Sequence, residues 1–81
     1  KIADNEYILS GRLEIDTANS KFDFNLPESE NYVTIAGYIL HHYQKFPKLN
    51  DTIEIENYTF KIMQAHNNRI DLVKLITNNK D

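Results

Sequence analysis

Apolar residues recur at helical spacing in the middle of the chain. Between Asn31 and Gln44 they gather on one side when successive residues are placed about 100° apart. This face consists of Tyr32, Val33, Ala36, Ile39, Leu40 and Tyr43, with Ile35 at its edge. The opposite face carries Thr34, Tyr38, His41 and Lys45, and His42 lies on the border. The pattern predicts an amphipathic helix that covers a sheet, capped by Asn31 or Ser29 and ended by about Gln44, because Pro47 follows.

Gly37 stands inside this predicted helix. A glycine in a helix interior costs about 1 kcal/mol relative to alanine. We therefore expect another stretch of backbone to approach Gly37 closely, with no room for a side chain. A tolerated surface glycine is the alternative.

The chain after the helix alternates with the period of strands. Residues 52–56 place Ile53 and Ile55 on one face, and residues 58–66 form the longest predicted strand. The pairs Glu56-Asn57 and Asn67-Asn68 predict tight reversals. In residues 69–77 the apolar phase changes, since Ile70 and Leu72 share one face while Val73 and Leu75 share the other. Either both faces are partly covered, or a bulge shifts the register.

Two shorter elements precede the helix. Residues 7–10 predict a strand that ends at Gly11, and residues 17–22 predict a short helix with Asp16 as its N-cap. The fold class is therefore α+β: one small domain over residues 1–81, with its core between about 7 and 76. Its order is strand, helix, helix and a three-strand antiparallel meander. The predicted core is Ala36, Ile39, Leu40, Tyr43, Phe46, Ile53, Ile55, Phe60, Ile62 and Ile70.

Composition excludes several classes of protein. The 81 residues contain no cysteine, which rules out disulfides and thiolate metal sites. The net charge is −3 with scattered basic residues, which argues against a nucleic-acid surface. No apolar run is long enough to insert into a membrane. Because the chain starts at Lys1 rather than Met, we expect it to be a piece excised from a longer protein.

Candidate chemical groups are few. His41 and His42 are adjacent, so on a helix their side chains diverge and cannot share one tetrahedral metal site. Asp51, Glu54 and Glu56 could form a loose oxygen site for a divalent cation, but an exposed strand face explains them more simply. No Ser, His and Asp series has a recognisable spacing. We expect no catalytic residue and no metal site.

Four ordered motifs carry a resemblance to a known family. They are Tyr7 to Gly11; Leu13 to Asn19; Val33 to Leu40 followed by Lys45-Phe46-Pro47-Lys48; and Tyr58 to Ile62 with Asn68-Arg69-Ile70. Together they resemble the CorC/HlyC transporter-associated domain. Two departures from the family pattern are Asn50 in place of glycine and Phe46 in place of isoleucine. Asn50 preserves the turn, since asparagine tolerates left-handed geometry. The motif residues to which the resemblance gives a structural role are Gly11, Asp16, Thr34, Gly37, Pro47, Asp51, Phe60, Arg69 and Ile70.

The resemblance implies a function that the residues alone do not. It implies a non-catalytic C-terminal regulatory domain of a hemolysin-like membrane protein that also carries CBS domains, proposed to modulate magnesium or cobalt transport. Its partners would be the CBS and transmembrane regions of the parent chain, with a homodimer formed through the parent. The domain would lie on the cytoplasmic side of the bacterial inner membrane.

A flavin-binding module is the alternative that the resemblance leaves open. The family fold is grouped with a subdomain of PCMH-type flavin enzymes, so FAD is a conceivable cofactor. A dinucleotide normally needs a glycine-rich loop or a free helix N-terminus, and here Gly11 and Gly37 lie in different elements. A small enzyme is a third hypothesis, for which no residue is a candidate. The surface we expect to contact a partner comprises Tyr38 and His41 on the helix and Glu54 and Lys61 on the strands.

Overall fold

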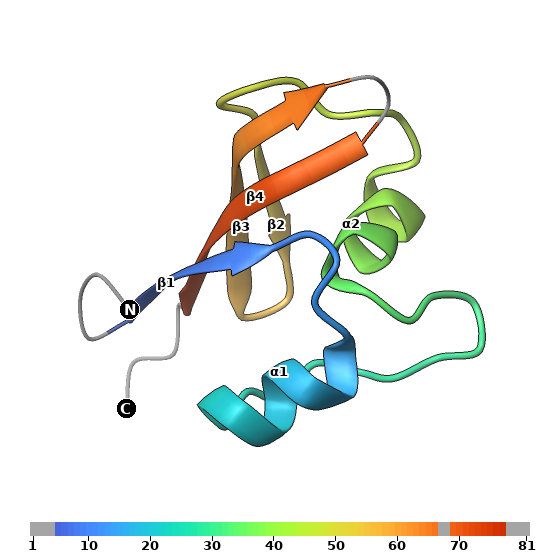
Figure 1. The fold of residues 1–81 in the computed structure, drawn as a ribbon, viewed down its shortest axis with the longest axis vertical. Helices are drawn as coiled ribbons and strands as arrows, with labels where there is room; N and C mark the ends of the chain where they lie inside the picture. The colour runs from blue at the N-terminus through green and yellow to red at the C-terminus, as the bar shows by residue number, and fades with distance from the viewer. Residues whose placement is uncertain (1–4, 67–68, 78–81) are drawn as a thin grey trace.

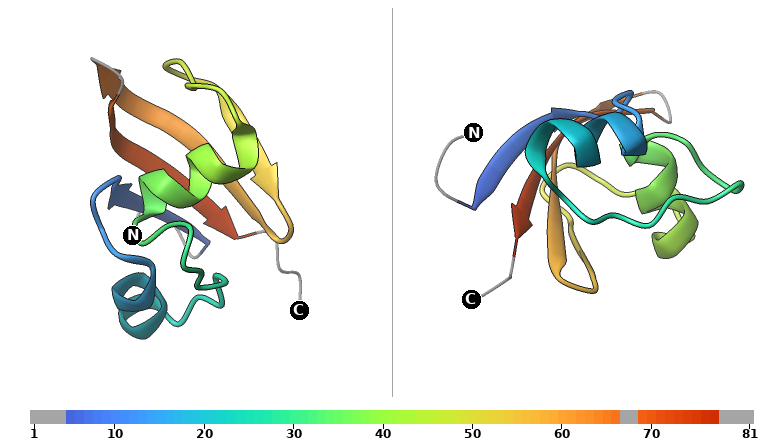
Figure 2. Two further views of the ribbon diagram at one scale, coloured as in Figure 1. Left: turned by 90° about the vertical axis from the view of Figure 1, so that its right-hand side faces the viewer. Right: turned by 90° about the horizontal axis from the view of Figure 1, so that it is seen from below.

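The chain folds into one antiparallel sheet with both helices on the same face. The computed structural model describes residues 5–66 and 69–77 (Figure 1). Within these residues the elements are β1 (Glu6–Ser10), α1 (Ile15–Phe22), α2 (Ile35–Tyr43), β2 (Thr52–Ile55), β3 (Tyr58–His66) and β4 (Arg69–Thr77). The strand order is β1-β4-β3-β2, so β1 adds a fourth strand to the predicted meander. Figure 2 shows α2 crossing the sheet, with α1 beyond its end.

Strand pairing separates the two faces of the sheet. One row of paired residues runs Tyr7, Leu75, Phe60 and Ile53 across all four strands and points toward the helices. The next row along, Ile8, Lys74, Lys61 and Thr52, points to the face that no described helix covers. This alternation follows from the two-residue period of strands and gives the sheet one buried and one open face.

The core lies between the sheet and the helices. Six of the predicted core residues are buried, namely Ile39, Ile53, Ile55, Phe60, Ile62 and Ile70, while Ala36, Leu40, Tyr43 and Phe46 are partly buried beside them. The prediction missed buried residues from every part of the chain. They are Leu9, Ile15, Ala18, Phe24, Leu26, Ile35, Tyr38, Val73 and Leu75.

A pair of irregularities explains the change of phase in β4. The register passes from Ile62–Val73 to Gln64–Leu72, which leaves Met63 of β3 without a Cα partner. It then passes to Ala65–Ile70, which leaves Asp71 of β4 without one. The shift lets Ile70, Val73 and Leu75 all face the core, and it confirms the bulge that the sequence left as one of two interpretations.

The turns agree with the sequence where the structure describes them. Glu56 has φ of 56° in the tight β2–β3 turn. Asn50 has φ of 70°, which confirms that it takes the left-handed geometry of the family's glycine. The reversal predicted at Asn67-Asn68 lies outside the described residues.

The central helix begins later than predicted, and one residue of its predicted outer face lies in the core. It starts at Ile35, with Thr34 rather than Asn31 or Ser29 as its N-cap, and it ends before Gln44 as expected. Ile39 of the predicted face is buried, and Ala36, Leu40 and Tyr43 lie partly buried beside the core. The buried helix residues are Ile35, Tyr38 and Ile39, the i, i+3, i+4 spacing of one stripe. Tyr38, predicted to be on the outer face, is 0% exposed.

The short helix also begins earlier than predicted. It runs from Ile15, its N-cap is Glu14, and no side chain makes a capping hydrogen bond. Asp16, the predicted N-cap, lies in the first turn instead. There its carboxylate still complements the positive end of the helix dipole.

Candidate functional site

Backbone hydrogen bonds tie the starts of both helices together. We call the two segments that meet here, residues 11–15 and 33–37, the junction. The N–H of Ile15 donates to the carbonyl oxygen of Val33 at 2.8 Å, and the N–H of Ile35 donates to that of Leu13 at 2.9 Å. Glu14 and Thr34 form an antiparallel bridge between them. This pairing holds Thr34 extended, which is why α2 cannot begin earlier.

The junction leaves no free N–H group in the first three residues of α2. Ile35 donates to Leu13 as described, and Ala36 donates to the carbonyl oxygen of Gly11 at 2.9 Å. Gly37 donates to Oγ1 of Thr34 at 3.1 Å. A helix N-terminus binds phosphate through unpaired N–H groups. The start of α2 is therefore closed to the pyrophosphate of a dinucleotide.

Gly11 connects the junction to the bulge in β4. Its N–H donates to the carbonyl oxygen of Asp71 at 2.9 Å, and a Cβ atom at this position would overlap with the carbonyl oxygen of Ile70. The close backbone approach predicted for Gly37 is thus found at Gly11. A Cβ atom on Gly37 would instead lie 3.2 Å from the Cβ atom of Tyr32.

The remaining motif residues shape loops and the core. The buried Pro47 precedes a turn in which the carboxylate of Asp51 accepts the N–H of Lys48 at 2.8 Å. Phe60 is fully buried on β3, and Arg69 lies exposed at the start of β4. The motif residues do not converge on one pocket. Most of them lie in turns, at helix starts or in the core, whereas Arg69 is an exposed strand residue.

The predicted contact residues lie on two different faces. Glu54 and Lys61 project from the open face of the sheet, whereas the exposed His41 lies on α2 across the sheet from them. Tyr38 is buried on the side of α2 that faces the sheet. The centroid of its ring lies 5.8 Å from that of Phe60. The predicted surface was therefore wrong as a single patch, because Tyr38 packs into the core.

The groups considered as metal ligands are kept apart. The imidazole rings of His41 and His42 are nearly perpendicular, with centroids 5.3 Å apart. Glu54 lies on the open face, whereas Asp51 is engaged in the turn before β2. Among the described residues, no group of three or more His, Cys, Asp or Glu side chains could hold a metal ion.

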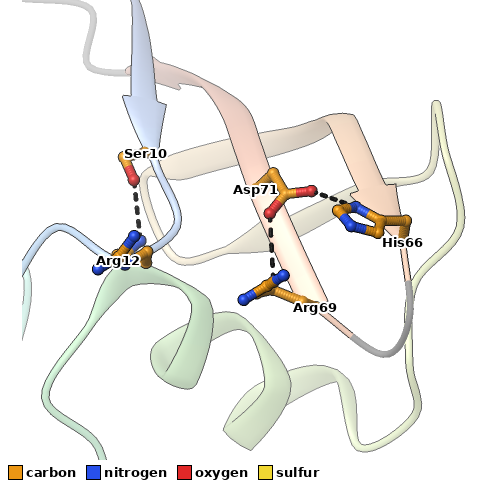
Figure 3. A network of polar contacts seen from close by, with 5 residues as sticks. All are labelled: Ser10, Arg12, His66, Arg69 and Asp71. Carbon is orange, nitrogen blue, oxygen red and sulfur yellow. Dashed lines mark hydrogen bonds and ion pairs between the residues drawn. The ribbon is translucent and has the colours of Figure 1, made fainter.

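One small polar network stands on the open surface beside the bulge. The Asp71 carboxylate lies between His66, with Nδ1 at 2.7 Å, and Arg69, with Nε at 3.5 Å (Figure 3). At the end of the neighbouring strand β1, the N–H of Arg12 in the following turn donates to the hydroxyl of Ser10 at 3.1 Å. His66 and Arg69 are more than half exposed, so these exposed ion pairs contribute little to stability, typically less than about 1 kcal/mol.

A hollow of about 360 Å³ opens at the other end of the sheet. It is lined by Tyr7, Phe22, Asp23, Phe24, Asn25, Asn57, Tyr58 and Thr77. These residues come from β1, the end of α1 with the segment after it, the β2–β3 turn with the start of β3, and the end of β4. The sequence analysis did not identify this hollow; its one local signal is the pair of phenylalanines that flank Asp23. We refer to it below as the aromatic hollow.

The aromatic rings of the hollow touch one another. Ring centroids lie 4.9 Å apart for Tyr7 and Phe24, 5.4 Å for Phe22 and Phe24, and 6.1 Å for Phe24 and Tyr58. The Tyr58 hydroxyl accepts the N–H of Asn25 at 2.9 Å, which fixes the segment after α1 against β3. Asp23 follows α1 with φ of 62°, a left-handed C-cap. These ring contacts and the hydrogen bond hold the walls of the hollow in place.

Comparison with known proteins decides the family. The model of a family described as CorC_HlyC, transporter associated domain, matches residues 1–79. The chain belongs to this family. The CorC_HlyC domain is 32% identical over 69 residues to the polyamine export protein of Escherichia coli strain K12, which covers 84% of this chain and 15% of that protein. It therefore spans a small fraction of the length of that relative.

Solved structures of CorC_HlyC domains share the fold. A hemolysin domain from Enterococcus faecalis V583 superposes with a TM-score of 0.83 at 26% identity, over 98% of this chain and 95% of that one. A CorC_HlyC domain of a Xylella fastidiosa Temecula1 hemolysin, in complex with Mg²⁺ and Mn²⁺, superposes with a TM-score of 0.75 at 20% identity, over 91% and 89%. The family and the α+β fold inferred from the sequence are confirmed. Kinship with PCMH-type flavin enzymes stays a prediction.

Proposed function

We propose that this CorC_HlyC domain is a non-catalytic regulatory part of a larger membrane export protein. The observation that carries the proposal is length: the domain aligns with 15% of a polyamine export protein that it matches over 84% of its own residues. The rest of such a protein would move the substrate, and this domain would adjust how it does so. Within the described residues, no helix is long and apolar enough to cross a membrane.

The open face of the sheet is the surface that suits contact with the rest of the protein. It presents one row of Glu6, Ile76, Thr59 and Glu54 and another of Ile8, Lys74, Lys61 and Thr52. Ile8 is 39% exposed, and beside it Nζ of Lys74 lies 3.7 Å from a carboxylate oxygen of Glu6. Apolar side chains interspersed with charges of both signs are typical of contacts between domains that separate and rejoin.

Regulation through this surface has a thermodynamic requirement. The domain can shift its parent between two states only by making contacts of different free energy in each. An open sheet face can do this without a ligand pocket, because a small rotation of the domain would engage or release a whole row of side chains. In the arrangement we propose, the partners are the CBS and transmembrane regions of the parent, with a homodimer formed through the parent. The domain lies on the cytoplasmic side of the bacterial inner membrane.

The transported species is a cation in this proposal. One relative is named for polyamine export, and a domain of the same fold was crystallised with Mg²⁺ and Mn²⁺. We propose that the domain itself holds neither a transition metal nor a flavin. The occupied N–H groups at the start of α2 support the second point, since a flavin dinucleotide would need them free.

Removal of the domain from its full-length protein tests the proposal. The full-length and truncated proteins are reconstituted in vesicles, and efflux of spermidine and of Mg²⁺ is measured over a range of concentrations. We expect the truncated protein to insert and fold but to export one of these cations with an altered concentration dependence or rate. Identical efflux curves for both cations would reject regulation and leave the domain as a stability element.

Titration of the isolated domain with FAD, followed by flavin fluorescence, tests the proposal that the domain holds no flavin. Micromolar binding of FAD would overturn that proposal.

A further inference from the structure

The aromatic hollow has the composition of a site for an organic cation. Four of its lining residues are aromatic, and Asp23 is the single charged side chain among the eight. Aromatic ring faces carry negative electrostatic potential and attract ammonium groups, and a neighbouring carboxylate adds to this attraction. The side-chain carbonyl groups of Asn25 and Asn57 and the hydroxyl of Thr77 can accept hydrogen bonds from an ammonium N–H. We propose that the hollow binds the ammonium end of an aliphatic amine.

The chain itself shows that one of these rings accepts an ammonium group. Nζ of Lys21 lies 5.7 Å from the centroid of the Phe22 ring. That distance is within the range of about 6 Å over which a cation interacts favourably with a ring face. Lys21 is not among the residues that line the hollow, so its ammonium does not fill the space beside Asp23.

The ring geometry argues against a flat heterocycle as the occupant. Tyr7 and Phe24 meet edge to face at 87°, and Phe24 and Tyr58 meet at 71°. Phe22 and Phe24 are closer to parallel, at 30°, but their centroids are only 5.4 Å apart. A planar ring inserted between two others needs them to be roughly 7 Å apart, because this is twice the ordinary distance between stacked rings. A flavin or nucleobase therefore has no slot here, whereas an ammonium group needs only one exposed ring face.

The lining also argues against a divalent metal ion. Ca²⁺ takes about six to eight oxygen ligands, and Mg²⁺ is usually held by one or two carboxylates together with phosphate oxygens and waters. Asp23 is the only carboxylate among the lining residues, and four of the other seven are aromatic. A singly charged ammonium with an apolar chain matches one carboxylate and four rings, and a volume of about 360 Å³ is within the range of small-molecule sites.

This inference extends the proposed function, because it names the class of molecule to which the domain would respond. Spermidine is the probe, and binding to the 81-residue chain is followed by two-dimensional NMR at fixed ionic strength. We expect saturable shifts confined to the aromatic signals of Tyr7, Phe22 and Tyr58 and to the amide of Asp23. Mg²⁺ at matched charge should not reproduce them.

Two variants and one control define the site. Asp23→Asn removes the charge but keeps a residue that tolerates the left-handed backbone. Phe22→Leu removes a ring but keeps the position apolar. Each should weaken spermidine binding about two- to fivefold, the effect of losing one exposed charge or cation–π contact. Asp16→Asn, the same change at an exposed aspartate in the first turn of α1, should leave binding unchanged.

Three results would overturn the inference. They are the absence of saturable shifts at millimolar spermidine, shifts spread over all acidic residues, and equal weakening by Asp16→Asn and Asp23→Asn. Any of these would leave the proposed regulatory role intact if truncation still altered efflux. Conversely, localised binding by the isolated domain would stand even if truncation had no effect.

Discussion

The backbone of Gly11 packs directly against the carbonyl group of Ile70. A Cβ atom on Gly11 would overlap with the carbonyl oxygen of Ile70 and lie 3.0 Å from its carbonyl carbon. On its other side the same Cβ atom would lie 3.3 Å from the Cβ atom of Ala36. Only glycine therefore allows β4 and the start of α2 to meet at this point.

Gly11→Ala should therefore destabilise the domain far more than Gly37→Ala. We expect a loss of about 1–3 kcal/mol or more for Gly11→Ala, because rigid backbone must move to admit the methyl group. At Gly37 the nearest atom is Cβ of Tyr32, in a loop that can shift by a few tenths of an ångström. There the change should stay within about 1 kcal/mol of the parent, since alanine also favours the helix. Chemical denaturation of both variants decides the matter, and an equal or larger loss at Gly37 would contradict this account of the junction.

Thr34→Ala should cost about 1 kcal/mol of unfolding free energy, because it removes the hydroxyl that caps Gly37. Asn31→Ala is the matched control, since Asn31 is an exposed residue that precedes the helix in the structure. Urea denaturation midpoints measure both changes. A larger loss at Asn31 would show that the helix begins earlier, as the sequence pattern alone suggested.

At neutral pH, the Tyr38→Phe domain should be as stable as the unsubstituted domain or more stable. The Tyr38 hydroxyl is buried and has no hydrogen-bond partner among the described residues, so the parent bears its desolvation cost. Thermal denaturation near pH 7 measures the effect. A loss greater than about 1 kcal/mol would mean that the hydroxyl has a partner, such as a buried water molecule.

Tyr38 should also make the domain sensitive to alkali. Burial, with a smaller contribution from the negative charge of Glu56, raises the pKa of Tyr38 to about 12, from 10.0 for a free tyrosine. A group whose pKa is higher in the folded state contributes stability below its unfolded pKa and loses it as pH rises. Between about pH 10 and 12 the unsubstituted domain should therefore lose stability more steeply than the Tyr38→Phe variant. Tyr43→Phe, which changes a half-buried tyrosine on the same helix, is the control, and parallel curves for parent and Tyr38→Phe would refute the assignment.

Local sequence pattern was sufficient for the strands but not for the junction. Residues 58–66 and 69–77 were predicted with the bounds that the structure shows, because apolar residues mark each segment as a strand and turn-forming residues precede it in the sequence. The start of α2 was missed because Thr34 is held extended by Glu14, a partner 20 positions earlier in the chain that no local pattern reveals. Burial of Tyr38 was missed because the helical pattern grouped it with polar residues, whereas its ring packs against Phe60 of β3.

The aromatic hollow lay beyond prediction for a related reason. Tyr7 and Tyr58 each begin a predicted strand, and Phe22 ends a predicted helix, so nothing in the sequence relates the three residues to one another. Only the pairing of β1 and β3 with β4 brings them to one end of the sheet. The family motifs were easier to find because each is a short contiguous segment that sets a turn or a helix start.

The most direct test of the central claim is substitution on the open face of the sheet in the full-length protein. Ile8→Glu places a charge on this face, and Leu49→Glu places the same charge on an exposed loop residue as a control. Because Ile8 is 39% exposed and Leu49 is 58% exposed, neither change should unfold the isolated domain. Cation efflux from reconstituted vesicles is then measured for both variants and the parent. If the domain regulates export through this face, Ile8→Glu should alter the concentration dependence of efflux as truncation does, while Leu49→Glu should match the parent. Parent-like efflux from Ile8→Glu, alongside altered efflux from the truncated protein, would contradict the account and place the regulatory contact elsewhere.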